Sequence, residues 1–296
     1  MPSRRERLAA RFERERAVRL PLGPDGIVIG AQSIRLTASP THAVLLLHGF
    51  NDTPQSIAPL AQAMHAAGWT VVAPLLAGHG RDLATMASAM RATVWTADVH
   101  REYTALRATH ATVVLCGLSM GGALCAQLAA TLPELPALVL LAPYLGMPWM
   151  LQLRLPAAWL AQRFTPYLVG RGGERSLHNP VARANALGPG INTARTLTEL
   201  RSIALAAERA LRAVRAPTLY LQSVEDNRVT ASDARRHFAM LGSTIREQHW
   251  LTGCGHIITA DYCRAEVARQ VIAWCARYAS SPHTGSASNW GGIGNA

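Results

Sequence analysis

The sequence of 296 residues and 31.8 kDa is long enough for one large α/β domain or for two smaller domains. Its composition, with 49% hydrophobic and 16% charged residues, excludes a chain that is disordered throughout. No apolar run approaches the ~20 residues that a membrane-spanning helix needs, so we expect a soluble globular protein with no integral membrane association.

The chain begins with an arginine-rich arm over residues 1–22. All 29 basic residues of the sequence are arginine, and seven of them lie in the first 19 positions. The arm lacks the apolar stretch and the small-residue cleavage site of a secretory signal, so we expect a cytoplasmic protein. The net charge of +11 leaves open a peripheral contact between this arm and an acidic surface. The other arginines are scattered, without aromatic interleaving or a helix-turn-helix pattern, and nucleic-acid binding is not expected.

Strand-like and helix-like segments alternate between residues 27 and 279. The expected strands are Ile27–Leu36, Ala43–Leu47, Thr70–Leu76, Thr112–Cys116, Ala137–Leu141, Thr218–Gln222 and Ile245–Trp250. The expected helices are Ser56–Ala67, Trp95–Thr109, Gly121–Leu132, Glu199–Val214, Ser232–Met240 and Asp261–Ala279. Most of the strands are apolar on both faces, as in parallel strands that helices cover on each side. This pattern predicts a doubly wound, mostly parallel α/β sheet flanked by helices.

One interval, residues 143–198, breaks this alternation. No strand is expected there, and apolar side chains such as Trp159 and Phe164 are closely spaced. Because the interval follows the carboxyl end of a strand, where open α/β sheets bind ligands, we expect it to form a helical lid. The expected parts of the chain are an arm at 1–22, a core at 23–142 and 199–279, a lid at 143–198 and a disordered Gly/Ser-rich tail at 280–296. The sequence does not indicate the oligomeric state.

A serine flanked by glycines follows the strand at Thr112–Cys116. The segment GLSMGG, residues 117–122, opens the next helix. A sharp strand-to-helix turn strains its central residue and lifts that side chain above the sheet edge, and the glycines let the two backbones approach. We therefore predict Ser119 as a nucleophile. The Met120 amide, at the helix N-terminus, is predicted as an oxyanion donor.

A serine hydroxyl needs a base that accepts its proton. In this order of motifs an acid and then a histidine should follow, each in the loop after a later strand. Asp226 follows the strand Thr218–Gln222, and His256 lies in a glycine-flanked turn after the strand Ile245–Trp250. We predict His256 as the general base and Asp226 as the acid that orients it. The adjacent Glu225 remains an alternative acid.

The second oxyanion donor is expected in the loop after the first central strand, which reads HGFNDTP at residues 48–54. The Phe50 amide is the best candidate, because Gly49 lets the backbone approach the substrate. His48 lies at the end of the strand, and we expect it to brace the loop through a hydrogen bond. The turn GHG at residues 78–80 is expected to shape the same edge.

The other histidines and the cysteines indicate no further site. His249 falls within a strand, and His237 lies on an arginine-rich helix, where we expect it to be solvated. The five cysteines are odd in number and lack a CxxC pattern, so we expect small buried hydrophobic side chains in a reducing compartment. No metal site is predicted.

Taken together, these motifs resemble the α/β-hydrolase superfamily, and within it the small bacterial carboxylesterases and monoacylglycerol lipases with a helical lid. The resemblance covers residues 40–278 and rests on HGF at 48–50, GHG at 78–80, GLSMGG at 117–122, Asp226 and Gly255-His256. It implies a cofactor-free serine esterase that acts on a small-molecule ester, with Ser119, Asp226 and His256 as its triad. It also implies Phe50 and Met120 as the oxyanion donors.

The substrate and the reaction type leave alternatives open. The apolar side chains of the expected lid favour esters with short-to-medium acyl chains or monoacylglycerol-like esters. The same triad also runs acyl transfer and thioester hydrolysis. A non-catalytic binding protein on the same fold is a further alternative.

Overall fold

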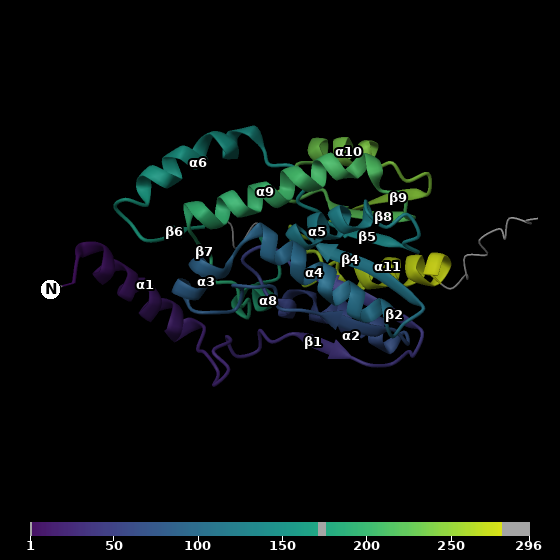
Figure 1. Cartoon of the computed structure of the whole chain (residues 1–296), viewed down its shortest axis with the longest axis horizontal. Coiled ribbons are helices and arrows are strands. Elements are labelled where there is room, and N and C mark those ends of the chain that lie inside the picture. The colour runs from purple at the N-terminus through teal and green to yellow at the C-terminus, as the bar shows by residue number, and fades with distance from the viewer. Residues whose placement is uncertain (1, 171–175, 280–296) are drawn as a thin grey trace, which may run out of the picture.

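A seven-stranded sheet between two layers of helices forms the fold in the computed structural model, which describes residues 2–170 and 176–279 (Figure 1). The strands of the sheet are β1 Ile34–Leu36, β2 His42–Leu47, β3 Thr70–Ala73, β4 Thr112–Leu118, β5 Leu138–Leu141, β8 Thr218–Ser223 and β9 Arg246–Leu251. Their order is β1-β3-β2-β4-β5-β8-β9. Of these strands, β1 alone runs antiparallel to its neighbour. The predicted mostly parallel α/β sheet is confirmed.

Helices cover both faces of the sheet (Figure 1). The helices and helical turns are α1 Arg4–Arg19, η1 Pro54–Ile57, α2 Ala58–Ala66, α3 Leu83–Ala89, α4 Ala92–Arg107, α5 Met120–Ala129, α6 Trp149–Ala161, α8 Pro180–Ala184, α9 Ala194–Ala210, η2 Leu211–Ala213, α10 Ala231–Met240 and α11 Arg264–Ala279. The helices α4, α5, α9 and α10 pack on one face, and α2 and α11 pack on the other. Along β2, Leu45 and Leu47 face the first layer, whereas Val44 and Leu46 face the second. Successive side chains of a strand alternate between faces, so an entirely apolar strand fills both layers.

Two elements differ from the prediction near the start of the core. The early strand expected at 27–36 pairs with β3 only over Ile34–Leu36, because the preceding residues turn at Gly26 and Gly30, both with positive φ. The helix α3 was not predicted. It has seven residues and is capped by the preceding Asp82, whose side chain accepts from the Thr85 N–H group. A helix this short shows no clear apolar period in the sequence.

The interval between β5 and α9 carries α6, α8 and two short strands, β6 Leu168–Val169 and β7 Ile191–Asn192. These strands form an antiparallel pair where no strand was expected, because two-residue strands leave no periodic pattern. The helix α6 packs along α9. The helix α9 begins at Ala194, which lies inside the interval expected to be a lid. Among the described residues, no helix is long and apolar enough to cross a membrane. The tail at 280–296 lies outside the described residues.

Candidate active site

The predicted nucleophile lies at the turn between β4 and α5. Ser119 has φ 54° and ψ −116°, a conformation that an L residue adopts only where the surrounding structure imposes it. A Cβ at Gly117 would lie 2.3 Å from the carbonyl carbon of Gly121, and a Cβ at Gly121 would lie 2.4 Å from the carbonyl oxygen of Leu47. Both positions require glycine, because here the helix passes too close to the strands for a side chain. The packing therefore holds Ser119 at the carboxyl edge of the sheet.

Three side chains from separate loops form one hydrogen-bonded row at this edge. The Nε2 atom of His256 lies 2.8 Å from the Oγ atom of Ser119, and its Nδ1 atom lies 2.7 Å from the Oδ2 atom of Asp226. The loops follow β4, β8 and β9, and parallel strands place such carboxyl-end loops along one edge. Ser119 is 9% exposed and His256 is 7% exposed, so bulk water has little access to the row. The structure thus brings together the three residues that the motifs singled out.

Asp226 accepts four hydrogen bonds. Its Oδ2 atom accepts from His256 and, at 2.8 Å, from Gln222 Nε2. Its Oδ1 atom accepts from the backbone N–H groups of Arg228 and Val229 at 2.7 and 3.0 Å. Burial raises the pKa of Asp226, but the facing imidazole and the backbone donors outweigh burial, and the net pKa lies below its ordinary value. The carboxylate is therefore ionised at neutral pH and favours the Nδ1–H tautomer of His256.

The loop that carries His256 is anchored by a second buried carboxylate, Asp261. This side chain accepts from four backbone N–H groups at 2.8–2.9 Å, those of Gly255, Tyr262, His178 and Asn179. Burial raises the pKa of Asp261, but the four hydrogen bonds outweigh burial and the net pKa lies below its ordinary value. Because two of the donors precede α8 and two lie in the histidine loop, Asp261 ties these two segments together.

A disulfide closes the same loop. Cys254 and Cys263 are bonded, with Cα atoms 5.9 Å apart, and the bond spans His256. The expectation of small buried hydrophobic side chains was wrong for this pair, whereas Cys116, Cys125 and Cys275 are free and buried. The nine-residue spacing in the sequence carries no sign of the pairing, because only the fold of the loop brings the two sulfur atoms together.

The alternative residues lie outside the row. Glu225 accepts from the Gly253 N–H group at 2.6 Å, whereas its neighbour Asp226 contacts His256. His249 is exposed on β9, 3.3 Å from Glu247. The expectation that His237 is solvated was wrong. Its ring is buried because α10 turns this side toward α9.

The two predicted oxyanion donors lie beside the serine. A Cβ at Gly49 would lie 3.4 Å from the Cβ atom of Ser119, so the loop that carries Phe50 runs next to the nucleophile. Within residues 2–170 and 176–279, the N–H group of Phe50 has no hydrogen-bond acceptor. The side chain of Ser119 does not cap α5, which leaves the amides of the first turn, including that of Met120, open at the positive end of the helix. Both amides are available to an oxygen atom next to Ser119.

His48 lies at the end of β2, fully buried. Its Nδ1 atom donates to the carbonyl oxygen of Gly49 at 2.8 Å, and its Nε2 atom accepts from the N–H group of Leu76 at 3.1 Å. This double use requires a neutral ring, and burial lowers the pKa of His48 to about 4. The two bonds connect the Gly49–Phe50 loop to the segment after β3, which is the bracing role expected from its position.

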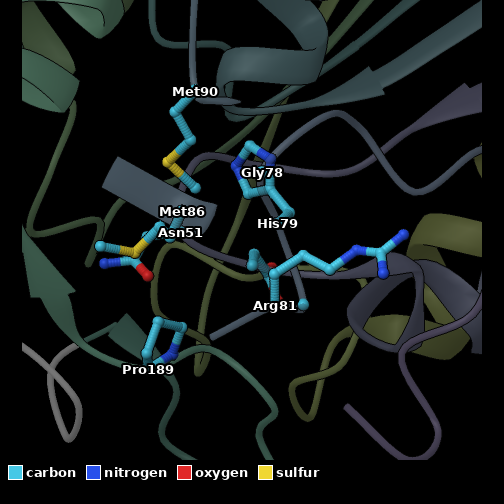
Figure 2. Close-up of a pocket in the computed structure, with 9 residues that line it drawn as sticks. Asn51, Gly78, His79, Arg81, Met86, Met90 and Pro189 are labelled. Carbon is cyan, nitrogen blue, oxygen red and sulfur yellow. The ribbon is translucent and has the colours of Figure 1, made fainter. Parts of the chain in front are cut away.

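A small cavity lies behind the same loop (Figure 2). Its lining residues are Asn51, Asp52, Gly78, His79, Gly80, Arg81, Met86, Met90 and Pro189. Its volume is about 10 Å³, which is room for about one water molecule. The cavity is therefore too small to hold an acyl chain.

The segment from 176 to 192 contacts three loops at the site, those that follow β2, β8 and β9. Asn51, next to the Phe50 amide, donates from Nδ2 to the carbonyl oxygen of Ile191 at 3.0 Å. In the other two loops, Ser176 Oγ donates to Asn227 Oδ1 at 3.0 Å, and the Ser176 carbonyl oxygen accepts from the Ile257 N–H group at 2.9 Å. Part of the interval expected to be a lid therefore packs against the loops of the site.

Sequence reasoning missed several polar residues that hold this arrangement together. Asp261 and Asn51 act through partners that are distant in sequence, and no local pattern marks them. Gln222 could have been found, since it is a polar residue at the end of an otherwise apolar strand. Asp52 was also missed. Burial raises its pKa to about 6, against the opposing effect of the hydrogen bond that it accepts from the Thr53 N–H group at 2.8 Å.

The row combines a hydroxyl, an imidazole and a carboxylate, the groups that activate a serine for attack on a carbonyl carbon. Among the described residues, no cluster of three or more His, Cys, Asp or Glu side chains is suited to hold a metal ion.

Sequence comparison relates the chain to hydrolases. Residues 38–262 match the family described as Serine aminopeptidase, S33. A thermostable monoacylglycerol lipase from Bacillus sp. (strain H-257) is 30% identical over 256 residues, which cover 86% of this chain and 97% of that protein.

Two solved structures show the same fold. One comes from work on LipS and LipT, two metagenome-derived lipolytic enzymes. It aligns with a TM-score of 0.76 and 29% identity, over 85% of this chain and 99% of that chain. The monoacylglycerol lipase of Paleococcus ferrophilus aligns with a TM-score of 0.69 over 83% of this chain and 98% of that chain, and at 19% identity it supports the fold alone.

Proposed function

The chain belongs to the Serine aminopeptidase, S33, family of α/β-hydrolases and is a lipase-like serine hydrolase, and we propose that it hydrolyses carboxylic esters through Ser119, His256 and Asp226. The observation that carries this proposal is the hydrogen-bonded row of these residues, with separations of 2.8 and 2.7 Å. A nucleophile, a base and an orienting acid stand in the order that acyl transfer to water requires.

In the proposed first step, Ser119 Oγ attacks the ester carbonyl carbon while His256 Nε2 accepts the hydroxyl proton. Asp226 stabilises the resulting imidazolium, because the carboxylate faces Nδ1 at 2.7 Å. The imidazolium then protonates the departing alcohol, which leaves an acyl group on Ser119. In the second step His256 takes a proton from the water that attacks the acyl carbon. The imidazolium then returns this proton to Ser119 Oγ as the bond between Oγ and the acyl carbon breaks, and the free acid is released.

The negative oxygen of each tetrahedral intermediate is proposed to bind the amides of Phe50 and Met120. Support comes from the uncommitted Phe50 amide beside Ser119 and from the open first turn of α5. Donors fixed in place before the reaction stabilise the developing charge without reorganisation. The bonds from His48 keep the Phe50 loop in position.

We propose monoacylglycerol-like esters or esters with short-to-medium acyl chains as the substrates. The family description names an aminopeptidase, but the relatives at 29–30% identity are named for lipolysis, which favours ester substrates. The interval 143–198 is proposed to act as a lid, because α6 exposes apolar side chains and the following segment contacts the catalytic loops. Its boundaries with the core at 142 and 199 remain part of this proposal.

The test compares Ser119→Ala with the matched variant Ser202→Ala, which changes an exposed serine on α9. For p-nitrophenyl butyrate and a monoacylglycerol, Ser119→Ala should lower kcat by about 10⁶, and Ser202→Ala should leave it unchanged. A fluorophosphonate probe should label the native protein and the control but not Ser119→Ala. Turnover by Ser119→Ala at the native rate would refute the nucleophile, and faster cleavage of aminoacyl anilides than of esters would refute the substrate class.

A further inference from the structure

The outward side of α6 is apolar and exposed. Its exposed apolar side chains, including one just beyond the helix, are Met150, Leu151, Leu153, Leu160 and Phe164, with the exposed Arg154 among them. Trp159 is also exposed, but its Nε1 atom donates to Thr198 Oγ1 on α9 at 3.3 Å. Leu153 is 66% exposed and Phe164 is 73% exposed, although the opposite side of the helix packs on α9. A cluster of exposed large apolar side chains of this kind marks an interaction site.

A stripe of arginines runs along α1. Arg4, Arg7, Arg11 and Arg14 recur at intervals of three and four residues, so they share one face of the helix. All four are exposed. One acidic neighbour, Glu15, pairs with Arg11 at 2.8 Å, which leaves the stripe with a clear positive charge.

Contacts with the rest of the protein hold α1 in place at the end of the molecule where α6 lies (Figure 1). The Phe12 ring packs against Tyr167, with centroids 5.7 Å apart. Two hydrogen bonds add to this contact, from Arg19 Nη2 to the carbonyl oxygen of Gly188 at 2.6 Å and from the Leu83 N–H group to Glu13 Oε2 at 2.9 Å. The side of α1 that carries Phe12 lies opposite the arginine stripe on the helix, so the stripe faces away from the protein.

We propose that this end of the molecule, formed by α1 and the outward side of α6, docks on an anionic lipid surface. The arginine stripe attracts the negatively charged head groups, and the exposed side chains of α6 enter the boundary between head groups and acyl chains. The helix α1 precedes residues 38–262, which match the family, so the basic half of this surface is an addition to the matched core. Docking would place the lid interval against the aggregate in which acylglycerols reside, and this last point alone rests on the proposed function.

Charge and apolarity together favour a lipid surface over other partners. A second copy of this chain, docked through the same face, would bring two arginine stripes together, and like charges repel. The phosphates of a nucleic acid would contact the arginine stripe. Single strands bind through bases that stack on aromatic side chains along a basic groove, so the aliphatic side chains of α6 would have no partner. An anionic bilayer satisfies both halves of the surface.

The test is vesicle co-sedimentation, with vesicles of phosphatidylcholine alone and of phosphatidylcholine mixed with phosphatidylglycerol. The native protein should bind the mixed vesicles more tightly, and added salt should weaken this binding. The triple variant Arg4→Gln, Arg7→Gln, Arg14→Gln should lose affinity for the mixed vesicles by about fivefold per arginine, on the order of 10² in total. The matched variant Arg209→Gln, Arg212→Gln, Arg264→Gln removes the same charge from other elements, and it should bind as the native protein does.

The double variant Leu153→Ser, Phe164→Ser tests the apolar half and should weaken binding to both kinds of vesicle by about tenfold per side chain. The arginine variants should hydrolyse soluble p-nitrophenyl butyrate at the native rate, and the double variant should keep the circular dichroism spectrum of the native protein. Binding is also measured on Ser119→Ala, so its outcome is independent of esterase activity. Equal affinity for the two vesicle types, an equal loss in the matched variant, or self-association through α6 in place of vesicle binding would overturn the proposal. Tighter binding to DNA than to mixed vesicles would do so as well.

Discussion

The substitution Asp226→Asn tests the central row with little change in shape. The carboxylate accepts four hydrogen bonds, two at each oxygen, and an amide has one oxygen to offer. If that oxygen faces His256, the amide NH2 group opposes two backbone N–H donors that cannot rotate. The oxygen should therefore face Arg228 and Val229, and the NH2 group should face His256 and Gln222.

This second orientation is accessible because Gln222 can adapt. Its Oε1 atom is buried without a hydrogen-bond partner in the described part of the chain, so a flipped Gln222 amide can accept from the new NH2 group. His256 Nδ1 must then accept as well, which moves the ring proton to Nε2. A protonated Nε2 cannot take the proton of Ser119, and we expect kcat to fall by about 10⁴, or about 5.5 kcal/mol in the activation barrier.

The assay measures kcat and KM for p-nitrophenyl butyrate, together with the rate of fluorophosphonate labelling. Both kcat and the labelling rate should fall for Asp226→Asn, whereas KM should change little because the substrate does not contact this side chain. Glu225→Gln is the matched control. Its amide oxygen can still accept from the Gly253 N–H group, and its kcat should stay native. A native kcat in Asp226→Asn, or an equal loss in Glu225→Gln, would refute the assignment of the acid.

Three further changes probe the surroundings of the row. Asp261→Asn removes an acceptor from two of four backbone N–H groups, and urea unfolding should show a loss of about 2–6 kcal/mol; native stability would contradict the anchoring role. Gly121→Ala places a Cβ 2.4 Å from the Leu47 oxygen, and thermal unfolding should report a loss of about 3–5 kcal/mol; native stability would contradict this close approach. His48 has a pKa of about 4 when folded and about 6.5 when unfolded, so its contribution to stability is complete above about pH 6.5. That contribution is lost as the pH falls toward 4, by up to about 3 kcal/mol, and urea titrations at several pH values that show no decline would contradict this.

Much of the fold was predictable because its signals are local. The apolar runs that became β2, β4, β5 and β8 are dictated by burial on both faces, and a short window of sequence reveals them. The glycines on either side of Ser119 lie only four positions apart in the sequence, so the strand-to-helix turn could also be inferred. Short elements such as α3 and β6 escaped, because a few residues do not establish a period.

The supporting contacts of the site were not predictable in the same way. Asp261 binds backbone groups of residues 178 and 179, more than 80 positions away, and Asn51 binds β7 across 140 positions. The Cys254–Cys263 bond likewise depends on the conformation of a loop, and the burial of His237 depends on the orientation of α10 relative to α9. The chemical type of a residue and its neighbours in the sequence carry no information about partners that lie so far away along the chain.

The amino-acid sequence alone determined the order of nucleophile, acid and base, the parallel sheet, and the turn that carries a serine at the edge of the sheet. These features follow from short-range preferences of glycine and from the alternation of apolar side chains. Only the tertiary structure decided that Ser119 and His256, 137 residues apart, meet at 2.8 Å, and that α1 and α6 share one end of the molecule. The packing of helices on a shared sheet sets such distances, because it orients every strand-end loop relative to the others at once.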